Sequence, residues 1–204
     1  MQSREFLLPG VASFLLAILF PIYWGSIYGM SFENFETAFI NDLATFDLMD
    51  GLFIIIGALE VYIYVSLARK LNQQFDSTAL KTLLYLMATV VIVLHSTVLF
   101  DIYLSFRDQP AVASIIETMA GIILFTAIGV LISYSVLGFI LSIILLKQRS
   151  DSVNLLKIFS VIVIIMCVLQ ITVVFSFTNI FLFPIALIVL ALYFFKQPET
   201  VEVV

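Results

Sequence analysis

The sequence predicts an all-α integral membrane protein, a bundle of six transmembrane helices with one additional amphipathic helix. Of the 204 residues, 63% are hydrophobic and only 11% are charged, and the mean hydropathy is +1.19. In a soluble domain about a quarter of the residues are charged. The apolar residues fall in runs long enough to cross ~30 Å of hydrocarbon. These runs are apolar on every side, whereas barrel strands alternate apolar and polar residues, so the spans are predicted to be helical.

The chain 1–204 is predicted to be a single transmembrane domain. The expected spans are about 6–28, 48–68, 82–104, 112–146, 158–177 and 180–195. In the first span Pro9 lies near the start, where a missing N–H costs little, and the internal Pro21 predicts a kink.

Residues 31–47 differ from the spans because their apolar side chains recur at intervals of three and four. The apolar residues at this spacing are Phe32, Phe35, Phe39, Leu43 and Phe46, which would share one face of a helix, and most acidic and amide residues lie outside that face. This pattern predicts an amphipathic helix along the outer interface.

The second and third spans are joined by a basic segment that begins with Arg69 and Lys70. Basic residues between two spans mark the cytoplasmic side of a membrane. The fourth run, 112–146, would reach about 50 Å as a helix at ~1.5 Å per residue. A long tilted helix that projects beyond the outer surface is expected, because two crossings would place the basic residues of 147–157 outside. The fifth and sixth spans are expected to meet in a tight turn at Thr178 and Asn179.

The charge distribution supports six spans with both termini in the cytoplasm of an inner or plasma membrane. In this topology, eight of the nine Lys and Arg residues are cytoplasmic and only Arg107 is outside. A model with five or seven spans would lose this asymmetry.

Glu60 is the sharpest feature, because an intramembrane carboxylate is costly and is a functional-site hypothesis by default. It is a candidate proton carrier or cation ligand. The alternative is a protonated or hydrogen-bonded Glu that ties two helices together, with Tyr64, one turn along, as a candidate neighbour.

His95, the only histidine, lies in the third span. A histidine can shuttle a proton or hold a ligand, but one histidine cannot by itself build a haem or zinc site. Alone it is better explained as a residue bonded to a backbone carbonyl or a hydroxyl. Contact with Glu60 would favour a proton relay instead.

Acidic residues gather near the predicted outer side. Asp101 and Glu117, with Asp47 and Asp50, could form a vestibule that concentrates cations. The simpler explanation is that acids such as Asp47, Asp50 and Glu117 stabilise helix N-termini.

Two small-residue pairs mark the fourth span, Gly129 with Ser133 and Gly138 with Ser142. This four-residue spacing allows close helix packing, also between copies of the chain. A polar path along the serines is the second possibility.

No catalytic motif is found: the sequence has no GxSxG, HExxH, CxxC, phosphate-binding glycine loop or GxGxxG. The single cysteine, Cys167, excludes an intramolecular disulfide and a thiolate metal site. No catalytic residue, metal or cofactor is therefore predicted. The net charge of −5 argues against a nucleic-acid partner. The expected partners are the lipid bilayer, a second copy of the chain or another membrane subunit.

Three functions remain. We favour a small transport or channel-type protein for a proton, cation or small solute that uses Glu60 and His95. This hypothesis predicts a cavity lined by Glu60. The alternative is a non-catalytic membrane subunit, such as an anchor, sensor or assembly partner, which predicts a closed bundle. An intramembrane enzyme ranks last, because no catalytic pair is evident.

Overall fold

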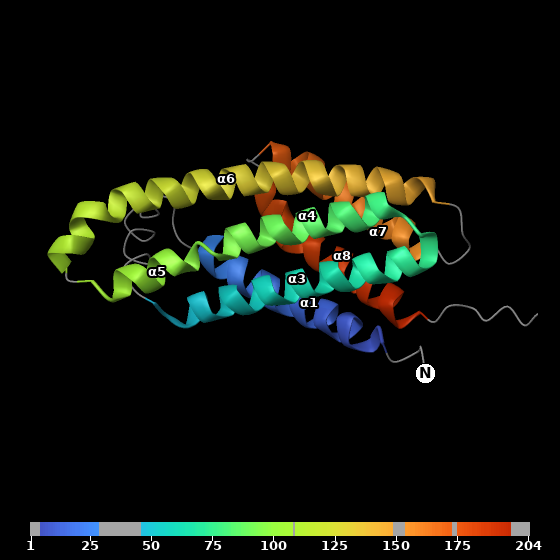
Figure 1. Ribbon diagram of the computed structural model, residues 1–204, viewed down its shortest axis with the longest axis horizontal. Helices are drawn as coiled ribbons and strands as arrows, with labels where there is room; N and C mark the ends of the chain where they lie inside the picture. The colour runs from blue at the N-terminus through green and yellow to red at the C-terminus, as the bar shows by residue number, and fades with distance from the viewer. Residues whose placement is uncertain (1–4, 29–45, 108, 149–153, 173–174, 197–204) are drawn as a thin grey trace, which may run out of the picture.

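The computed structural model describes residues 5–28, 46–107, 109–148, 154–172 and 175–196, and within these ranges it is helical without strands (Figure 1). The elements are α1 (Leu7–Tyr28), α3 (Leu48–Phe75), α4 (Thr78–His95), α5 (Val98–Ser105), α6 (Gln109–Lys147), α7 (Asn154–Ile171), the 3₁₀ turn η4 (Ser176–Thr178) and α8 (Asn179–Phe195).

Six of the helical segments are long and apolar enough to cross a membrane, which confirms the predicted class and number of spans. The predicted amphipathic helix 31–47 lies outside the described residues except for its last two positions. Those are Phe46 and Asp47, and Asp47 is the N-cap of α3.

The six spans form a closed ring. Going around it, α1 packs on α3, α3 on α4, α4 on α6, α6 on α7, α7 on α8, and α8 returns to α1. Neighbours along the chain are thus neighbours in space, and the first and last spans close the circle (Figure 1). This arrangement leaves an interior to which every span can contribute side chains.

The two ends of the ring differ, and we name them by their connections. The turn end contains the α3–α4 turn, and the η4 end contains η4. Near the turn end the interior is filled by leucines with at most 1% exposure: Leu67, Leu71, Leu80, Leu84, Leu141, Leu145, Leu156 and Leu190. The outward faces carry large exposed apolar side chains, as lipid-facing surfaces require.

The basic segment between the second and third spans is helical, where the sequence suggested a turn from Arg69 onward. α3 continues to Phe75, and the turn is made by two residues only. Asp76 adopts a left-handed conformation (φ 45°), and its N–H bonds the Asn72 carbonyl. Ser77 then caps α4 by accepting from the Leu80 N–H.

This longer α3 carries Lys70 to the end of α8. The Lys70 Nζ donates to the carbonyls of Tyr193 (2.6 Å) and Phe194 (3.2 Å), in the last turn of α8. A cation at a helix C-terminus is stabilised by the helix dipole and satisfies carbonyls that lack partners. The ammonium also lies over the ring of Phe6, 5.2 Å from its centroid, so it joins α3 and α8 with the residue that precedes α1.

The third span, predicted as continuous over 82–104, is interrupted between α4 and α5. Ser96 and Thr97 at the break donate their hydroxyls to the carbonyls of Val93 (2.8 Å) and Leu94 (2.7 Å). Such bonds to carbonyls three residues back compete with the helical ladder. The backbone bonds also shorten there to i−3 pairs, such as Thr97 N–H to Leu94 carbonyl.

α6 is one helix of 39 residues, as expected for the fourth run, and would measure about 58 Å at ~1.5 Å per residue. Its first half lies opposite α5 and projects beyond the other long helices (Figure 1). A small cluster of Leu104, Ile116 and Ile123 holds this hairpin together. The fifth span, α7, ends earlier than the predicted 158–177, and η4 replaces the expected tight turn.

Candidate functional site

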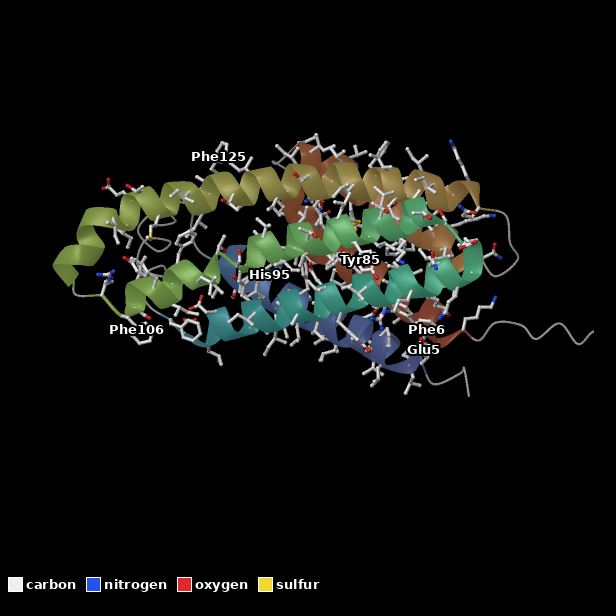
Figure 2. All side chains as sticks on the ribbon, in the orientation of Figure 1. Glu5, Phe6, Tyr85, His95, Phe106 and Phe125 are labelled. Atoms are coloured by element: carbon white, nitrogen blue, oxygen red, sulfur yellow. The ribbon has the colours of Figure 1, made fainter. Side chains whose placement is uncertain are left out.

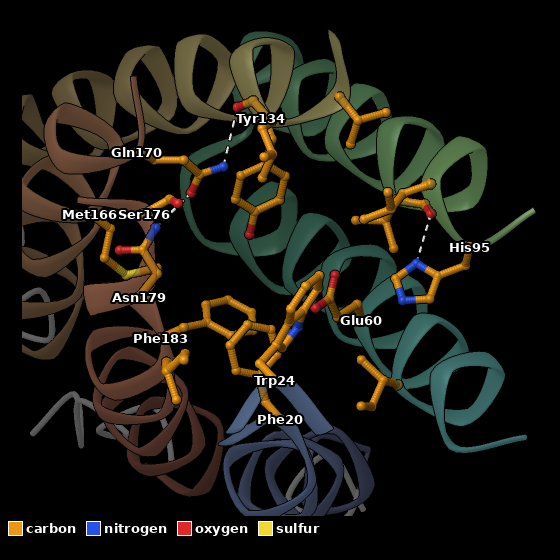
Figure 3. A pocket seen from close by; sticks show the side chains of 16 residues that line it. Phe20, Trp24, Glu60, His95, Tyr134, Met166, Gln170, Ser176, Asn179 and Phe183 are labelled. Carbon is orange, nitrogen blue, oxygen red and sulfur yellow. Dashed lines mark hydrogen bonds between the residues drawn. The ribbon is translucent and has the colours of Figure 1, made fainter. Parts of the chain in front are cut away.

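A cavity of about 130 Å³ lies inside the ring in its η4 half. All six spans line it: Phe20 and Trp24 from α1, Ile56 and Glu60 from α3, Val91, Leu94 and His95 from α4, Val130, Leu131 and Tyr134 from α6, Met166 and Gln170 from α7, and Asn179, Ile180 and Phe183 from α8, with Ser176 of η4 (Figure 3). The walls are largely apolar with a few polar groups, as in many small-molecule sites.

Glu60 reaches this cavity from the middle of α3. It is twelve residues from the first residue of α3, Leu48, which corresponds to about 18 Å along the axis. Its side chain is only 7% exposed, and the cavity is the space that it lines. Within the described part of the chain no group hydrogen-bonds the Glu60 carboxyl.

His95 lies at the last position of α4, just before the break. Its Nδ1 is 2.9 Å from the carbonyl oxygen of Val91. A carbonyl only accepts, so Nδ1 carries the hydrogen and Nε2 is the acceptor in the neutral ring. The imidazole stacks on Phe53 at 4.2 Å between centroids and packs directly against the backbone of Gly57. Three contacts therefore fix its position.

Glu60 and His95 share the cavity without a hydrogen bond between them in the described structure (Figure 3). Phe53 and Gly57, which contact His95, lie on the same face of α3 as Glu60, because the three residues follow one another at intervals of four and three. The arrangement places an acid and an imidazole around a common space. A solute in that space could contact both.

Two tyrosines separate this cavity from a second, smaller one. The hydroxyls of Tyr64 on α3 and Tyr134 on α6 hydrogen-bond each other. Tyr134 lines the larger cavity, and both tyrosines line the smaller cavity of about 20 Å³, which is large enough for one water molecule. Since α4 lies between α3 and α6 in the ring, this bond crosses the interior.

The wall formed by α6, α7 and α8 contains a polar chain. The Gln170 amide donates to the Leu131 carbonyl of α6 (3.2 Å) and accepts from the Asn179 amide of α8 (2.7 Å). Gln170 thus links three helices, which is the bonding that buried amides commonly provide between membrane helices. The Asn179 Oδ1 atom, by contrast, is buried without a hydrogen-bond partner in the described structure, and Asn179 lines the cavity. The acceptors that remain for a ligand therefore lie on α8 as well as on α3 and α4.

The other acidic candidates lie away from the cavity lining. Asp101 is half-buried on α5, and Glu117 is exposed on α6, eight residues after its first residue, so it does not stabilise that N-terminus. Asp47 and Asp50 form a capping box at the start of α3, in which Asp47 accepts from the Met49 N–H at 2.6 Å.

The two small-residue pairs of α6 have different surroundings. Gly138 lies against α7, where an added Cβ would come within 3.0 Å of the Cys167 Sγ, and Ser142 is fully buried. Gly129 has no neighbour within 4 Å of such a Cβ, and Ser133 is exposed, with its hydroxyl bonded to the Gly129 carbonyl.

Sequence reasoning did not identify Tyr134, Phe53, Gly57 or Asn179. A buried tyrosine needs a hydroxyl partner, which was the available signal for Tyr134. A glycine inside an apolar helix suggests close approach of another group, which was the signal for Gly57. The identity of the partner in each case depends on the ring arrangement.

In the ranges that the structure describes, no three His, Cys, Asp or Glu side chains converge on a possible metal position. Comparison with protein-family models, with curated proteins and with solved structures finds no match to this chain.

Proposed function

We propose that the protein transports a small solute, cation or proton through the interior of its six-helix ring, and that Glu60 binds the transported species. One observation carries the proposal: a buried carboxyl with no hydrogen-bond partner in the described chain lines a cavity to which all six spans contribute. Ionisable groups inside membrane proteins are costly and mark substrate or ion pathways.

The remaining interior supports a path that is closed towards the turn end. From the larger cavity a solute would meet the Tyr64–Tyr134 bond, then the small cavity, then the leucine layer. Transport therefore requires the tyrosine pair and the leucines to separate. Alternating access to a central site by movement of helices is the general solution in membrane transporters.

The proposed orientation places the turn end in the cytoplasm of an inner or plasma membrane, with both termini on that side. It rests on the basic residues of that end, among them Arg69 and Lys81, and on the predicted position of 31–47 at the outer interface. The Glu60 cavity would then lie in the outer half of the bilayer.

Flux into liposomes tests the proposal. Purified protein is reconstituted with an internal pH-sensitive dye, and uptake is followed under an imposed potential and, separately, with candidate solutes. The proposal expects uptake by the wild type and its loss in Glu60→Gln. Glu117→Gln is the matched control, because it removes an exposed carboxyl outside the cavity. Uptake that persists in Glu60→Gln would contradict the proposal.

A second function, a non-catalytic subunit of a homo-oligomer or larger complex, is favoured by a different surface. Phe106, just after α5, and Phe125 of α6 are 85% and 81% exposed, on opposite edges of the α5–α6 hairpin (Figure 2). Gly129 and Ser133 of α6 are exposed as well. Small exposed residues permit close helix association. Cross-linking in native membranes tests this function. If it is correct, Gly129→Leu disrupts an oligomer, whereas Glu60→Gln leaves the oligomer intact.

A further inference from the structure

The charges of the cavity are unbalanced. Among its lining residues Glu60 is the only carboxyl, and neither Lys nor Arg is present. Buried charges in proteins are normally paired, because an isolated charge in an apolar site is strongly disfavoured. A buried carboxyl without a basic neighbour is neutralised either by a proton or by a cation in the same space. A cationic occupant of the cavity would therefore take the place of the proton on Glu60.

Aromatic rings surround the same space. Phe20 and Trp24 of α1, Tyr134 of α6 and Phe183 of α8 all line the cavity, and the rings of Phe20 and Phe183 lie 4.6 Å apart. Aromatic faces attract organic cations through the ring quadrupole, most strongly where water is excluded. They also accommodate the apolar part of a ligand.

The hydrogen-bonding groups favour a ligand that donates. Because Nδ1 of His95 donates to Val91, the remaining ring nitrogen accepts. A Glu60 carboxylate accepts only. A ligand with N–H groups would satisfy both residues, whereas a second carboxylate would be repelled.

The volume limits the size of the ligand. Cavities of about 150 Å³ in other proteins hold one benzene-sized molecule, so the cavity of about 130 Å³ suits about five or six non-hydrogen atoms. A desolvated Ca²⁺ ion would need about six to eight oxygen ligands, which largely apolar walls do not provide.

We propose that the cavity binds a small organic ammonium ion, with its charged nitrogen at Glu60 and its short apolar body among the aromatic rings of α1, α6 and α8. This inference deepens the proposed transport function and rests on it for the biological role of the ligand. Binding itself is measured separately from flux.

The chain supplies its own reporter, because Trp24 is its only tryptophan and lines the cavity. Full-length protein in lipid nanodiscs at pH 7 is titrated with n-butylammonium, with the neutral 1-butanol and with the anion butyrate, while Trp24 fluorescence is recorded. These probes have similar size and differ in charge. We expect saturable binding of the cation, and at least about tenfold weaker binding of the alcohol, because hydrogen bonds to charged groups are the stronger ones.

Glu60→Gln should weaken n-butylammonium binding by about tenfold or more and change 1-butanol binding by less than about twofold. Glu117→Gln should behave as the wild type. If Glu60→Gln does not fold, the comparison of the three probes on the wild type still shows whether the cavity selects a cation. Equal binding of alcohol and cation, no saturable binding of the cation, or cation binding unchanged in a folded Glu60→Gln protein would each overturn the proposal.

The two proposals fail in distinguishable ways. Selective binding of n-butylammonium without flux of any solute would refute transport and leave the ligand class standing. Proton flux that depends on Glu60, with no selective binding of the ammonium ion, would refute the ligand class alone.

Discussion

Gly57→Ala tests the packing that positions His95. An alanine Cβ at position 57 would come within 2.8 Å of the His95 Cβ and closer still to its ring, a separation that real Cβ atoms essentially never show. The ring has little freedom to withdraw, because Nδ1 is bonded to the Val91 carbonyl and Phe53 stacks on the imidazole. The substitution must therefore displace His95 or move α3 from α4.

Three effects set the size of the change. Replacing a helical glycine by alanine contributes about 1 kcal/mol of stability. Overpacking typically costs about 1–3 kcal/mol. Loss of the His95–Val91 bond would add about 0.5–1.5 kcal/mol. The net expectation is a destabilisation of about 0.5–3.5 kcal/mol, so the steric effect outweighs helix propensity.

Gly129→Ala is the matched control, because an added Cβ at position 129 meets no atom within 4 Å. It should be neutral or stabilising by up to about 1 kcal/mol. Both variants are compared by thermal unfolding in detergent, followed by circular dichroism. If Gly57→Ala were as stable as Gly129→Ala, the close approach of His95 to α3 would be refuted.

Three further substitutions test other contacts. Lys70→Met removes a cation that donates at 2.6 and 3.2 Å to the last carbonyls of α8, and should cost about 1.5–3 kcal/mol of unfolding free energy. Tyr134→Phe leaves the Tyr64 hydroxyl without its partner; we expect a loss of about 1–3 kcal/mol, seen as a lower unfolding temperature. Asp47→Ala removes the N-cap of α3 and should cost about 1 kcal/mol, measured by denaturation and by faster amide exchange in the first turn of α3.

A different result would contradict each of these three predictions. An unchanged unfolding temperature in Lys70→Met would mean that the α3–α8 link contributes nothing. For Tyr134, full stability of the phenylalanine variant would argue against a bond across the ring. For Asp47, an unaltered exchange rate would show that the cap is dispensable.

The six spans were predictable because the length of an apolar run measures how far a helix can cross the bilayer. The long α6 followed from the same reasoning. The closure of the ring was not predictable, because it depends on α1 meeting α8 at opposite ends of the chain. The break after His95 depends on Ser96 and Thr97 bonding to carbonyls behind them, and many such residues lie in unbroken helices.

Glu60 and His95 could be selected from the sequence because polar groups inside apolar spans are conspicuous. Whether the Glu60 and His95 side chains touch each other could not be predicted from the sequence, because this depends on the rotation of α3 and α4 about their axes. Gly57 and Phe53 illustrate the limit, because they are ordinary residues of an apolar helix until the partner ring is placed. The same holds for Tyr134, whose partner comes from a helix that is not its neighbour.

The most direct measurement for the role of Glu60 combines covalent labelling with flux. Liposomes containing the protein are treated at acidic pH with a small apolar carbodiimide, which reacts with protonated carboxyl groups, and the modified residues are identified by mass spectrometry. If the Glu60 cavity is the transport site, Glu60 becomes modified and solute uptake falls in proportion to that modification. Uptake that remains complete while Glu60 is fully modified, or a Glu60 that stays unmodified while Glu117 reacts, would contradict the proposed site.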